Sequence, residues 1–226
     1  MIPKGITELP NGQWVLEQDS HISRWAEQHG NIITDRPLMN WLKPYLDAHG
    51  VTTVLDGGAN IGDTSRAYLD WGYEVIAIEP NPLAFRCLQN NCPDATCINY
   101  ALSDTDQGSL RFLQLDNVGA SRIHPEGNIH VIPILGDSLL RTHKPPSFIK
   151  LDLEGHEMNA LRGLEETIEN HRPIILCEIN RGALEANGFT AMDILNFFRK
   201  RGYSVDTLYP PQANLGWEQF DVLAIP

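Results

Sequence analysis

The chain has 226 residues, and its 17 Lys and Arg against 29 Asp and Glu give a formal net charge of −12. Such a charge repels a phosphate backbone or an anionic bilayer, so nucleic acid and membrane lipid are excluded as first-choice partners. A chain of this length and ordinary apolar content can close one sizeable core, whereas two domains would leave one of them small. We therefore expect a single domain.

The cysteines indicate a reducing compartment. Cys87, Cys92, Cys97 and Cys177 form no CxxC pair, so we expect buried free thiols. Residues 1–14 lack the apolar core of a secretory signal, and no run of about 18 apolar residues is present to span a membrane. We expect a cytoplasmic protein without membrane insertion.

The order of elements predicts the fold class. Residues 1–50 indicate a short hairpin around Asn11 and Gly12 and one or two helices, which we expect to cap the domain formed by residues 51–226. From residue 51 onward, short runs rich in Val, Ile and Leu alternate with amphipathic stretches. This alternation is typical of a doubly wound α/β fold with a mostly parallel sheet. The strands expected from it are residues 51–56, 74–79, 95–103, 147–154 and 173–180.

The helices between these strands carry recognisable start signals. We expect one helix over residues 63–71. Asn81 followed by Pro82 predicts the N-cap and first residue of another. Thr190 and Asp193 predict a capping box at the start of a helix near the C-terminus.

The C-terminal segment departs from simple strand–helix alternation. Residues 203–209 and 220–225 are strand-like, and the loop between them has no room for a crossover helix. They should therefore pair as an antiparallel hairpin at one edge of the sheet.

An irregular, β-prone insertion covers residues 108–134, where we expect two or three short strands and a glycine-containing loop. Four residues of this insertion could cover a bound ligand, but we interpret the segment as an ordinary loop. They are Asn117, Gly119, Ser121 and Arg122.

The turn after the first predicted strand indicates a nucleotide-like cofactor. It reads DGGANIG from Asp56 to Gly62, and Gly57, Ala59 and Gly62 occupy the small positions of a G-x-G/A-x-x-G turn. Small residues let the backbone approach a ligand closely, and the following helix offers unpaired N–H donors. Glu79 ends the next strand, where an acidic side chain can accept the hydroxyls of a ribose.

The choice of nucleoside depends on further features, because NAD would use the same turn and the same acid. Asp56 directly precedes the glycines, the motif does not begin the chain, and the sheet ends in a hairpin. Asp56 can face a cationic amino group, whereas it would repel a pyrophosphate. These features favour S-adenosylmethionine. An NAD-dependent oxidoreductase and a non-catalytic nucleoside-binding module are the alternatives.

Longer motifs resemble the FkbM family of methyltransferases. The resemblance rests on LDGGANIGDTS (55–65), IEPNP (78–82), ALSD (101–104), IKLDLEGHE (149–157), LRGL (161–164) and RPIILCEIN (172–180). It implies a class I, Rossmann-like methyltransferase fold with a mostly parallel seven-stranded sheet, and usually O-methylation of hydroxyls on sugars or natural products. Gly57 departs from the family, which more often carries a β-branched residue there. The cofactor-binding residues expected on these motifs are Asp56, Gly57, Gly58, Ala59, Asn60, Gly62, Glu79, Pro80, Asn81, Ala101, Leu102 and Asp152.

The acceptor side should lie where two further strands end. The fourth strand delivers Asp152, Glu154, His156 and Glu157 to the ligand-binding edge, and the fifth delivers Glu178 and Asn180. Neighbouring carboxylates repel one another, so their convergence indicates a ligand, a proton or a cation between them. We expect His156 or Glu154 to act as the general base for a small-molecule or glycan hydroxyl, while Asp152 and Glu178 orient that acceptor.

A metal-assisted version of the same reaction stays open. Asp152 and Glu178, with Asn180 nearby, offer the hard oxygen ligands that magnesium prefers. We favour the general base over this divalent cation. The sequence makes no prediction of the oligomeric state.

Overall fold

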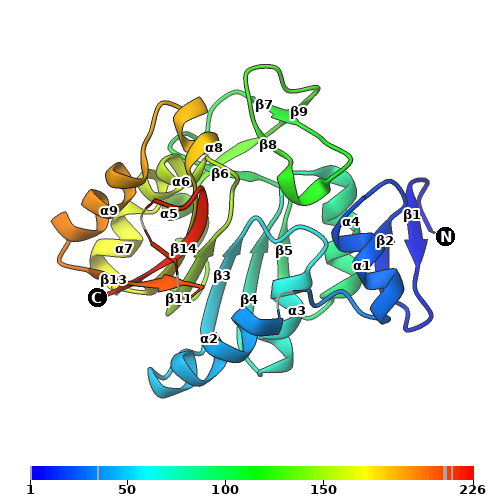
Figure 1. The fold of residues 1–226 in the computed structure, drawn as a ribbon, viewed down its shortest axis with the longest axis horizontal. Helices are drawn as coiled ribbons and strands as arrows, with labels where there is room; N and C mark the ends of the chain where they lie inside the picture. The colour runs from blue at the N-terminus through cyan, green and yellow to red at the C-terminus, as the bar shows by residue number, and fades with distance from the viewer. Residues whose placement is uncertain (1, 35, 211–212, 215) are drawn as a thin grey trace.

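A seven-stranded sheet forms the centre of the protein (Figure 1). The computed structural model describes residues 2–34, 36–210, 213–214 and 216–226. The strand order is β13-β14-β12-β11-β3-β4-β5, and β3, β4, β5, β11 and β12 run parallel. Their bounds are Thr53–Gly57 for β3, Glu74–Ile78 for β4, Thr96–Ile98 for β5, Phe148–Leu151 for β11 and Ile174–Asn180 for β12. The predicted mostly parallel α/β sheet is confirmed.

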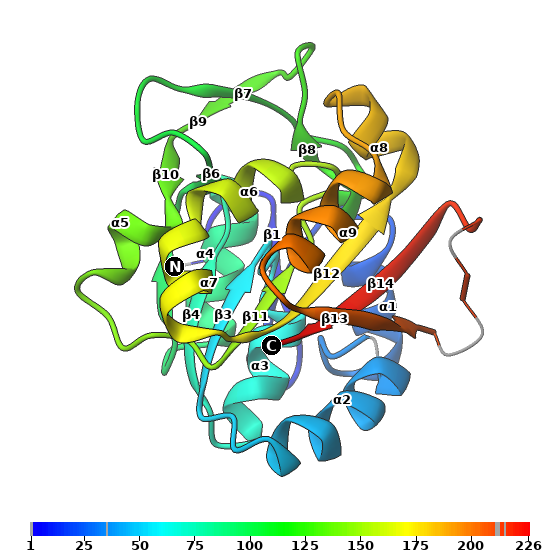
Figure 2. The ribbon, with the colours of Figure 1, turned by 90° about the vertical axis from the view of Figure 1, so that its left-hand side faces the viewer.

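Helices cover both faces of this sheet, because side chains that alternate along each strand enter two different cores. Leu55 and Ile149 pack against α5 (Gly136–Leu140), α6 (Glu157–Gly163), α7 (Glu165–His171) and α9 (Ala191–Lys200), which Figure 2 shows in front of the sheet. Val54 and Phe148 pack instead against α2 (Arg36–Ala48), α3 (Asp63–Asp70) and α4 (Pro82–Asn91).

The helix starts follow the sequence signals. The Asn81 side chain caps α4 by accepting the backbone N–H of Leu83 at 3.1 Å. Thr190 and Asp193 form the expected capping box of α9. Both predictions are confirmed.

The C-terminal hairpin forms the expected edge of the sheet. Strand β14 (Gln219–Ile225) lies between β12 and β13 (Ser204–Tyr209) and is antiparallel to both. This geometry places the start of β14 beside the end of β12, at the edge where the parallel strands terminate. The last strand therefore contributes side chains to that edge.

The expected third strand, residues 95–103, was wrong as a single element. It divides into β5 and β6 (Ala101–Ser103), and β6 leaves the central sheet to pair in parallel with β10 (Pro133–Leu135). The Asn99 side chain accounts for the break, because its Nδ2 donates to the carbonyls of Glu79 at 2.7 Å and Pro80 at 3.1 Å. The chain is thereby turned across the end of β4.

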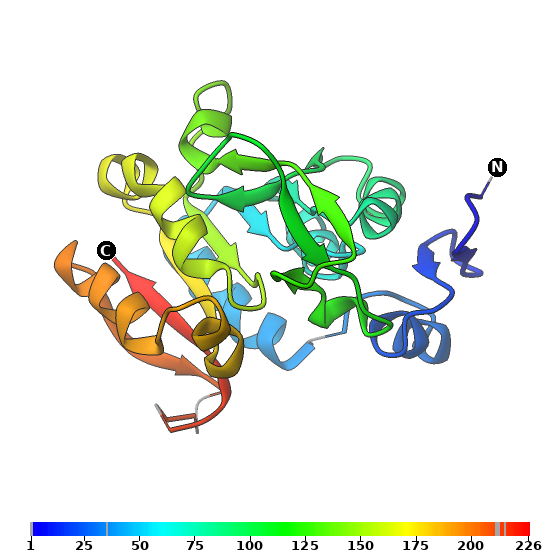
Figure 3. The same cartoon turned by 90° about the horizontal axis from the view of Figure 1, so that it is seen from above.

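The insertion builds a small sheet of its own. Strands β7 (Leu110–Leu113), β8 (Arg122–Ile123) and β9 (Ile129–Val131) pair antiparallel, and the 3-10 turn η1 (Val118–Ala120) joins β7 to β8. Figure 1 shows this green segment above the upper end of the central sheet, and Figure 3 views it from that end. The insertion thus lies over one edge of the sheet.

The N-terminal segment packs beside α4. Strands β1 (Ile6–Glu8) and β2 (Trp14–Leu16) form the expected hairpin, and α1 (Ile22–His29) follows. The buried Asn91 side chain, at the end of α4, accepts the backbone N–H of Trp14 at 2.7 Å and donates to its carbonyl at 2.8 Å. These bonds tie β2 to the helix that follows β4.

The four cysteines are free, as expected, and three of them are buried. Among the residues that the structure describes, no helix has both the length and the apolar character needed to cross a bilayer.

The contact between α6 and β6 provides a test of the fold. A Cβ on Gly163 would lie 1.9 Å from the Ser103 carbonyl oxygen, so Gly163→Ala should lower the free energy of unfolding by about 1–3 kcal/mol. Urea denaturation measures the change. Gly119→Ala is the matched control, because its Cβ would meet no atom closer than 3.5 Å. Equal stability of the two variants would contradict the close packing of α6 on β6.

Candidate functional site

A cavity of about 640 Å³ opens where the parallel strands end. Gly58 follows β3, Glu79 follows β4, and Asp152 follows β11; all three line the cavity. The insertion and the C-terminal hairpin supply the opposite walls. This is the edge at which ligands bind in open α/β sheets, and the volume is typical of ligand pockets.

The turn between β3 and α3 is held against both neighbouring strands. The backbone N–H groups of Gly58 and Ala59 both donate to the Ile78 carbonyl at 3.0 Å. Gly58 has φ +78°, and a Cβ there would lie 1.9 Å from the carbonyl oxygen of Asp152. Only glycine combines this backbone conformation with so close an approach. The predicted turn is therefore shaped by its packing on β4 and on the loop after β11.

Asp56 lies behind the turn and does not line the cavity. Its side chain is completely buried, and Oδ2 accepts the hydroxyls of Thr64 at 2.8 Å and Ser65 at 2.6 Å. Asp56 therefore anchors the first turn of α3 from the side that faces away from the cavity. The carboxylate that does line the cavity beside this turn is Asp63, the first residue of α3.

Glu79 occupies the position expected of a ribose ligand. It lines the cavity, and its two oxygens accept backbone N–H groups from Asn60 at 2.9 Å and Asn81 at 2.7 Å. Each carboxylate oxygen has a further lone pair available for a hydroxyl. Burial raises the pKa of Glu79 to about 7.

The other predicted cofactor residues divide into two groups. Asn60, Pro80, Ala101, Leu102 and Asp152 line the cavity with Gly58 and Glu79. The remaining ones stand behind this wall, where they shape the turn and the start of α4. They are Gly57, Ala59, Gly62 and Asn81.

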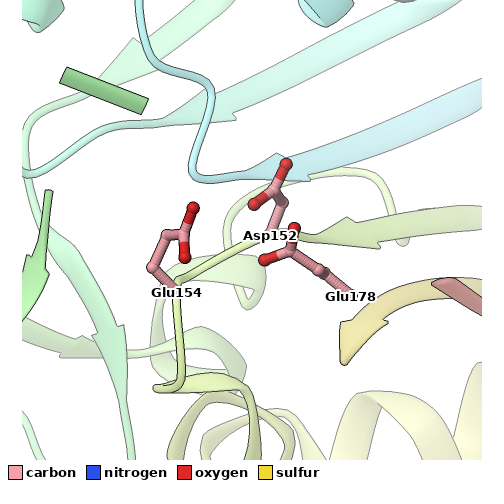
Figure 4. Close-up of side chains that lie close together, drawn as sticks. All are labelled: Asp152, Glu154 and Glu178. Atoms are coloured by element: carbon pink, nitrogen blue, oxygen red, sulfur yellow. The ribbon is translucent and has the colours of Figure 1, made fainter. Parts of the chain in front are cut away.

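Three carboxylates converge on one side of the cavity, where the sequence predicts the acceptor to bind (Figure 4). Asp152, Glu154 and Glu178 offer oxygens that all lie within 4.8 Å of one another. Gln219 on β14 donates to Glu178 Oε1 at 2.6 Å, and Asn180 donates to Glu154 Oε2 at 3.0 Å. The amides thus orient two of the three acids from neighbouring strands.

These carboxylates differ in protonation. Burial would raise the pKa of Asp152, but the charge and hydrogen bond of Lys150, whose Nζ lies 2.9 Å from Oδ2, lower it overall. Burial and the Asp152 charge raise the pKa of Glu154 to about 7. Burial, Asp152 and Glu154 raise the pKa of Glu178 well above its usual range. Asp152 therefore favours the ionised form, whereas Glu178 beside it favours the protonated form.

His156 lines the same side of the cavity but is poorly suited to accept a proton. It is the N-cap residue of α6, and its Nε2 lies 3.1 Å from the Ser103 hydroxyl. Burial lowers its pKa to about 4, so the imidazole is neutral at physiological pH. Glu157 beside it is fully buried and accepts the backbone N–H groups of Leu153 and Gly155, which fixes the loop that carries Glu154.

The oxygen ligands available to a cation differ from the expected set. Asn180 Oδ1 accepts the backbone N–H of Ala183 as the N-cap of α8 (Arg181–Ala186), and its Nδ2 faces Glu154. Asn180 therefore presents its donor, and Glu154 is the third carboxylate beside Asp152 and Glu178.

The structure adds cavity residues that the sequence did not identify. Lys150 and Asp63 line the wall near the cofactor turn, and Gln219 lines it from the C-terminal hairpin. Lys150 had a signal, since it is the single charge in the buried strand FIKL. The interpretation of the insertion as an ordinary loop was wrong, because its four candidate residues line the cavity: Asn117, Gly119, Ser121 and Arg122.

These residues fit S-adenosylmethionine. Glu79 faces a diol, Ala101 and Leu102 offer an apolar surface to a base, and Asp63 and Asp152 offer negative charge to a cationic ligand. Four polar atoms on the cavity wall are buried without a hydrogen-bond partner among the described residues. They are Asn60 Oδ1, Asn117 Oδ1, His156 Nδ1 and Glu178 Oε2.

Comparisons with known proteins agree with this geometry. The family model described as Methyltransferase FkbM domain matches residues 56–205. Hexuronic acid methyltransferase AglP of Haloferax volcanii is 30% identical over 135 residues, which cover 56% of this chain and 55% of that protein. The chain thus matches about half the length of this curated relative.

Solved structures show the same fold. An FkbM methyltransferase from Methylobacillus flagellatus KT superposes with a TM-score of 0.53 at 19% identity, over 76% of this chain and 43% of that one. Magnesium protoporphyrin IX methyltransferase from Synechocystis PCC 6803, with bound S-adenosylmethionine, gives a TM-score of 0.53 at 12% identity over 92% of both chains. The class I methyltransferase fold is confirmed. The chain belongs to the FkbM family of S-adenosylmethionine-dependent methyltransferases.

Proposed function

We propose that the protein transfers a methyl group to a hydroxyl of a sugar or glycan acceptor. The observation that carries this proposal is the convergence of Asp152, Glu154 and Glu178 on one side of the cavity. Carboxyl groups and amides are strong hydrogen-bond partners for hydroxyls, and Gln219 and Asn180 add two amides to the same wall. Such a surface suits an acceptor with several hydroxyl groups.

The curated relative supports a carbohydrate acceptor. Its name, hexuronic acid methyltransferase, describes a sugar acid as its substrate. The match covers 55% of that protein, so the support extends to the class of acceptor and leaves the methylated position open.

The reaction asks two things of the protein. Bound S-adenosylmethionine supplies a methyl group on a positively charged sulfur, which departs as a neutral thioether. The protein must hold the acceptor oxygen in line with the methyl carbon and that sulfur, and it must accept the hydroxyl proton. Asp152 can accept a hydrogen bond from a neighbouring acceptor hydroxyl, and protonated Glu178 can donate one.

Glu154 is the better of the two expected bases. It lines the cavity, Asn180 orients its carboxylate, and its pKa of about 7 leaves it both ionised and basic near physiological pH. His156, with a pKa of about 4 and a hydrogen bond to Ser103, is the weaker base. We therefore propose that the hydroxyl proton moves to Glu154 as the bond from oxygen to the methyl carbon forms.

The sequence left two alternatives to a methyltransferase, an oxidoreductase and a non-catalytic binding module. The family match replaces the NAD-dependent oxidoreductase, because it shows a methyltransferase domain over residues 56–205. A non-catalytic module would bind S-adenosylmethionine and transfer no methyl group to any acceptor. The convergence of Asp152, Glu154 and Glu178 on the cavity favours a catalytic protein over such a binding module.

Removal of Glu79 tests the cofactor side. Glu79→Ala should weaken S-adenosylhomocysteine binding by about tenfold to a hundredfold, because a charged acceptor for the ribose hydroxyls is lost. Isothermal titration calorimetry measures the affinity, and circular dichroism checks the fold. Glu74→Ala is the matched control, since Glu74 lies exposed at the opposite end of the same strand. Undiminished affinity in Glu79→Ala would remove Glu79 from the ribose site.

The pH profile tests the base. Because Glu154 must be ionised, the turnover of the wild-type enzyme should rise with pH up to about 7 and then level off. Glu154→Gln should lower kcat by about 10²–10⁴-fold and abolish this rise while cofactor affinity is kept. Transfer of radioactive methyl groups to sugar-rich extracts gives the rates. If Glu154→Gln keeps the profile and His156→Gln loses it, the base is His156.

A chelator separates the base from metal assistance. A divalent cation needs deprotonated ligands, whereas Asp152 already pairs with Lys150 and burial raises the pKa of Glu178 well above its usual range. Turnover should therefore survive dialysis against EDTA. Loss of turnover that added magnesium restores would replace the general base by a metal bound to the three carboxylates.

A further inference from the structure

A second group of charges lines the cavity where α2, α3 and β11 meet, and the acceptor chemistry above uses it only through the bond of Lys150 to Asp152. It consists of Thr34, just before α2, Asp63, the first residue of α3, and Lys150 in the middle of β11. Asp63 directly follows the cofactor turn that ends at Gly62. The group therefore lies on the cofactor side of the cavity.

Each charged member has hydrogen-bonding capacity left for a ligand. Thr34 Oγ1 donates to Asp63 Oδ2 at 3.2 Å, which orients that carboxylate. Lys150 is 6% exposed, and the bond of Nζ to Asp152 uses one of its three protons. A negative and a positive side chain thus stand together on one wall of the cavity.

The balance of charge around them favours a ligand that is itself charged. Burial raises the pKa of Asp63 to about 6; Lys150 opposes this increase, and Asp56 and Asp152 add to it. Burial would lower the pKa of Lys150, but Asp152 and Asp56 raise it well above its usual range. Three carboxyl groups therefore face a single ammonium, and the region accommodates one more cationic group.

We propose that Asp63 and Lys150 bind the amino-acid end of S-adenosylmethionine, Asp63 through its α-ammonium and Lys150 through its α-carboxylate. The ligand end is a zwitterion, and the wall offers one opposite charge to each of its two groups. Thr34 positions Asp63, and Asp152 on the other side of Lys150 fixes the ammonium that meets the α-carboxylate. This assignment concerns the cofactor and is independent of the acceptor.

A comparison of two ligands isolates the proposed contact. S-adenosylhomocysteine carries the amino-acid end, whereas 5′-methylthioadenosine keeps the nucleoside and the sulfur but lacks that end. Calorimetry gives the affinity of both for the wild type, Lys150→Gln and Asp63→Asn. In each variant S-adenosylhomocysteine should lose about tenfold or more in affinity, while 5′-methylthioadenosine binds as in the wild type.

Two matched controls exclude general effects. Glu154→Gln removes one charge from the same cavity on the acceptor side and should leave the ratio of the two affinities unchanged. Asp70→Asn is the same type of substitution as Asp63→Asn, but at the exposed end of the same helix. It should also leave the ratio of the two affinities unchanged.

The ratio of affinities decides the proposal. If both ligands weaken equally in Lys150→Gln and Asp63→Asn, these side chains support the fold of the site only, and the proposal fails. It also fails if neither variant changes the ratio. If Lys150→Gln does not fold, the affinities of Asp63→Asn alone decide the proposal, because asparagine has the same size and shape as aspartate. Absence of methyl transfer to any acceptor would contradict the proposed function and leave this binding result intact.

Discussion

The contact between the cofactor turn and the loop after β11 is the constraint on which the site depends. The missing Cβ of Gly58 lets the Asp152 carbonyl come so close that β3 and β11 end at the same depth. Two N–H groups of the turn bind the Ile78 carbonyl and bring β4 to the same level. Glu79, Asp63 and Asp152 consequently face one cavity, although they follow three different strands. The positions of these side chains are therefore set by the packing of the backbone.

Once the strand ends are fixed, electrostatics decides how so many acids share one edge. Lys150 favours the ionised form of Asp152, while burial and acidic neighbours favour the protonated form of Glu178. Glu154, nearer to solvent and held by Asn180, is left with an intermediate affinity for protons. In the proposed reaction, one cluster therefore supplies a hydrogen-bond acceptor, a hydrogen-bond donor and a base to the hydroxyl groups of the substrate.

Local signals in the sequence were sufficient for much of the fold. Apolar runs, the Asn81 cap, the Thr190 capping box and the final hairpin all have causes within a few residues, and each prediction was confirmed. Prediction failed where partners lie far apart in the chain. Nothing beside Asn99 shows that its side chain will bind the Glu79 carbonyl and divide a strand. Asp63 and Lys150 likewise gain their place in the cavity from the meeting of α3 and β11. Four residues of the insertion were interpreted as an ordinary loop because their place on the cavity wall depends on the sheet beneath them.

The hydrogen bond from Gln219 to Glu178 has a consequence for the order of assembly. Ribosomal synthesis delivers β3, β4, β11 and β12 in sequence, and these strands can pair and build the cofactor side before β14 is made. Glu178 receives its amide partner from a residue 41 positions later, when β14 inserts between β12 and β13. If Glu178 orients the acceptor as proposed, the side of the cavity that faces the acceptor is the last to be completed. A nascent chain would then form the cofactor side first, and the final strand would add the amide that orients Glu178.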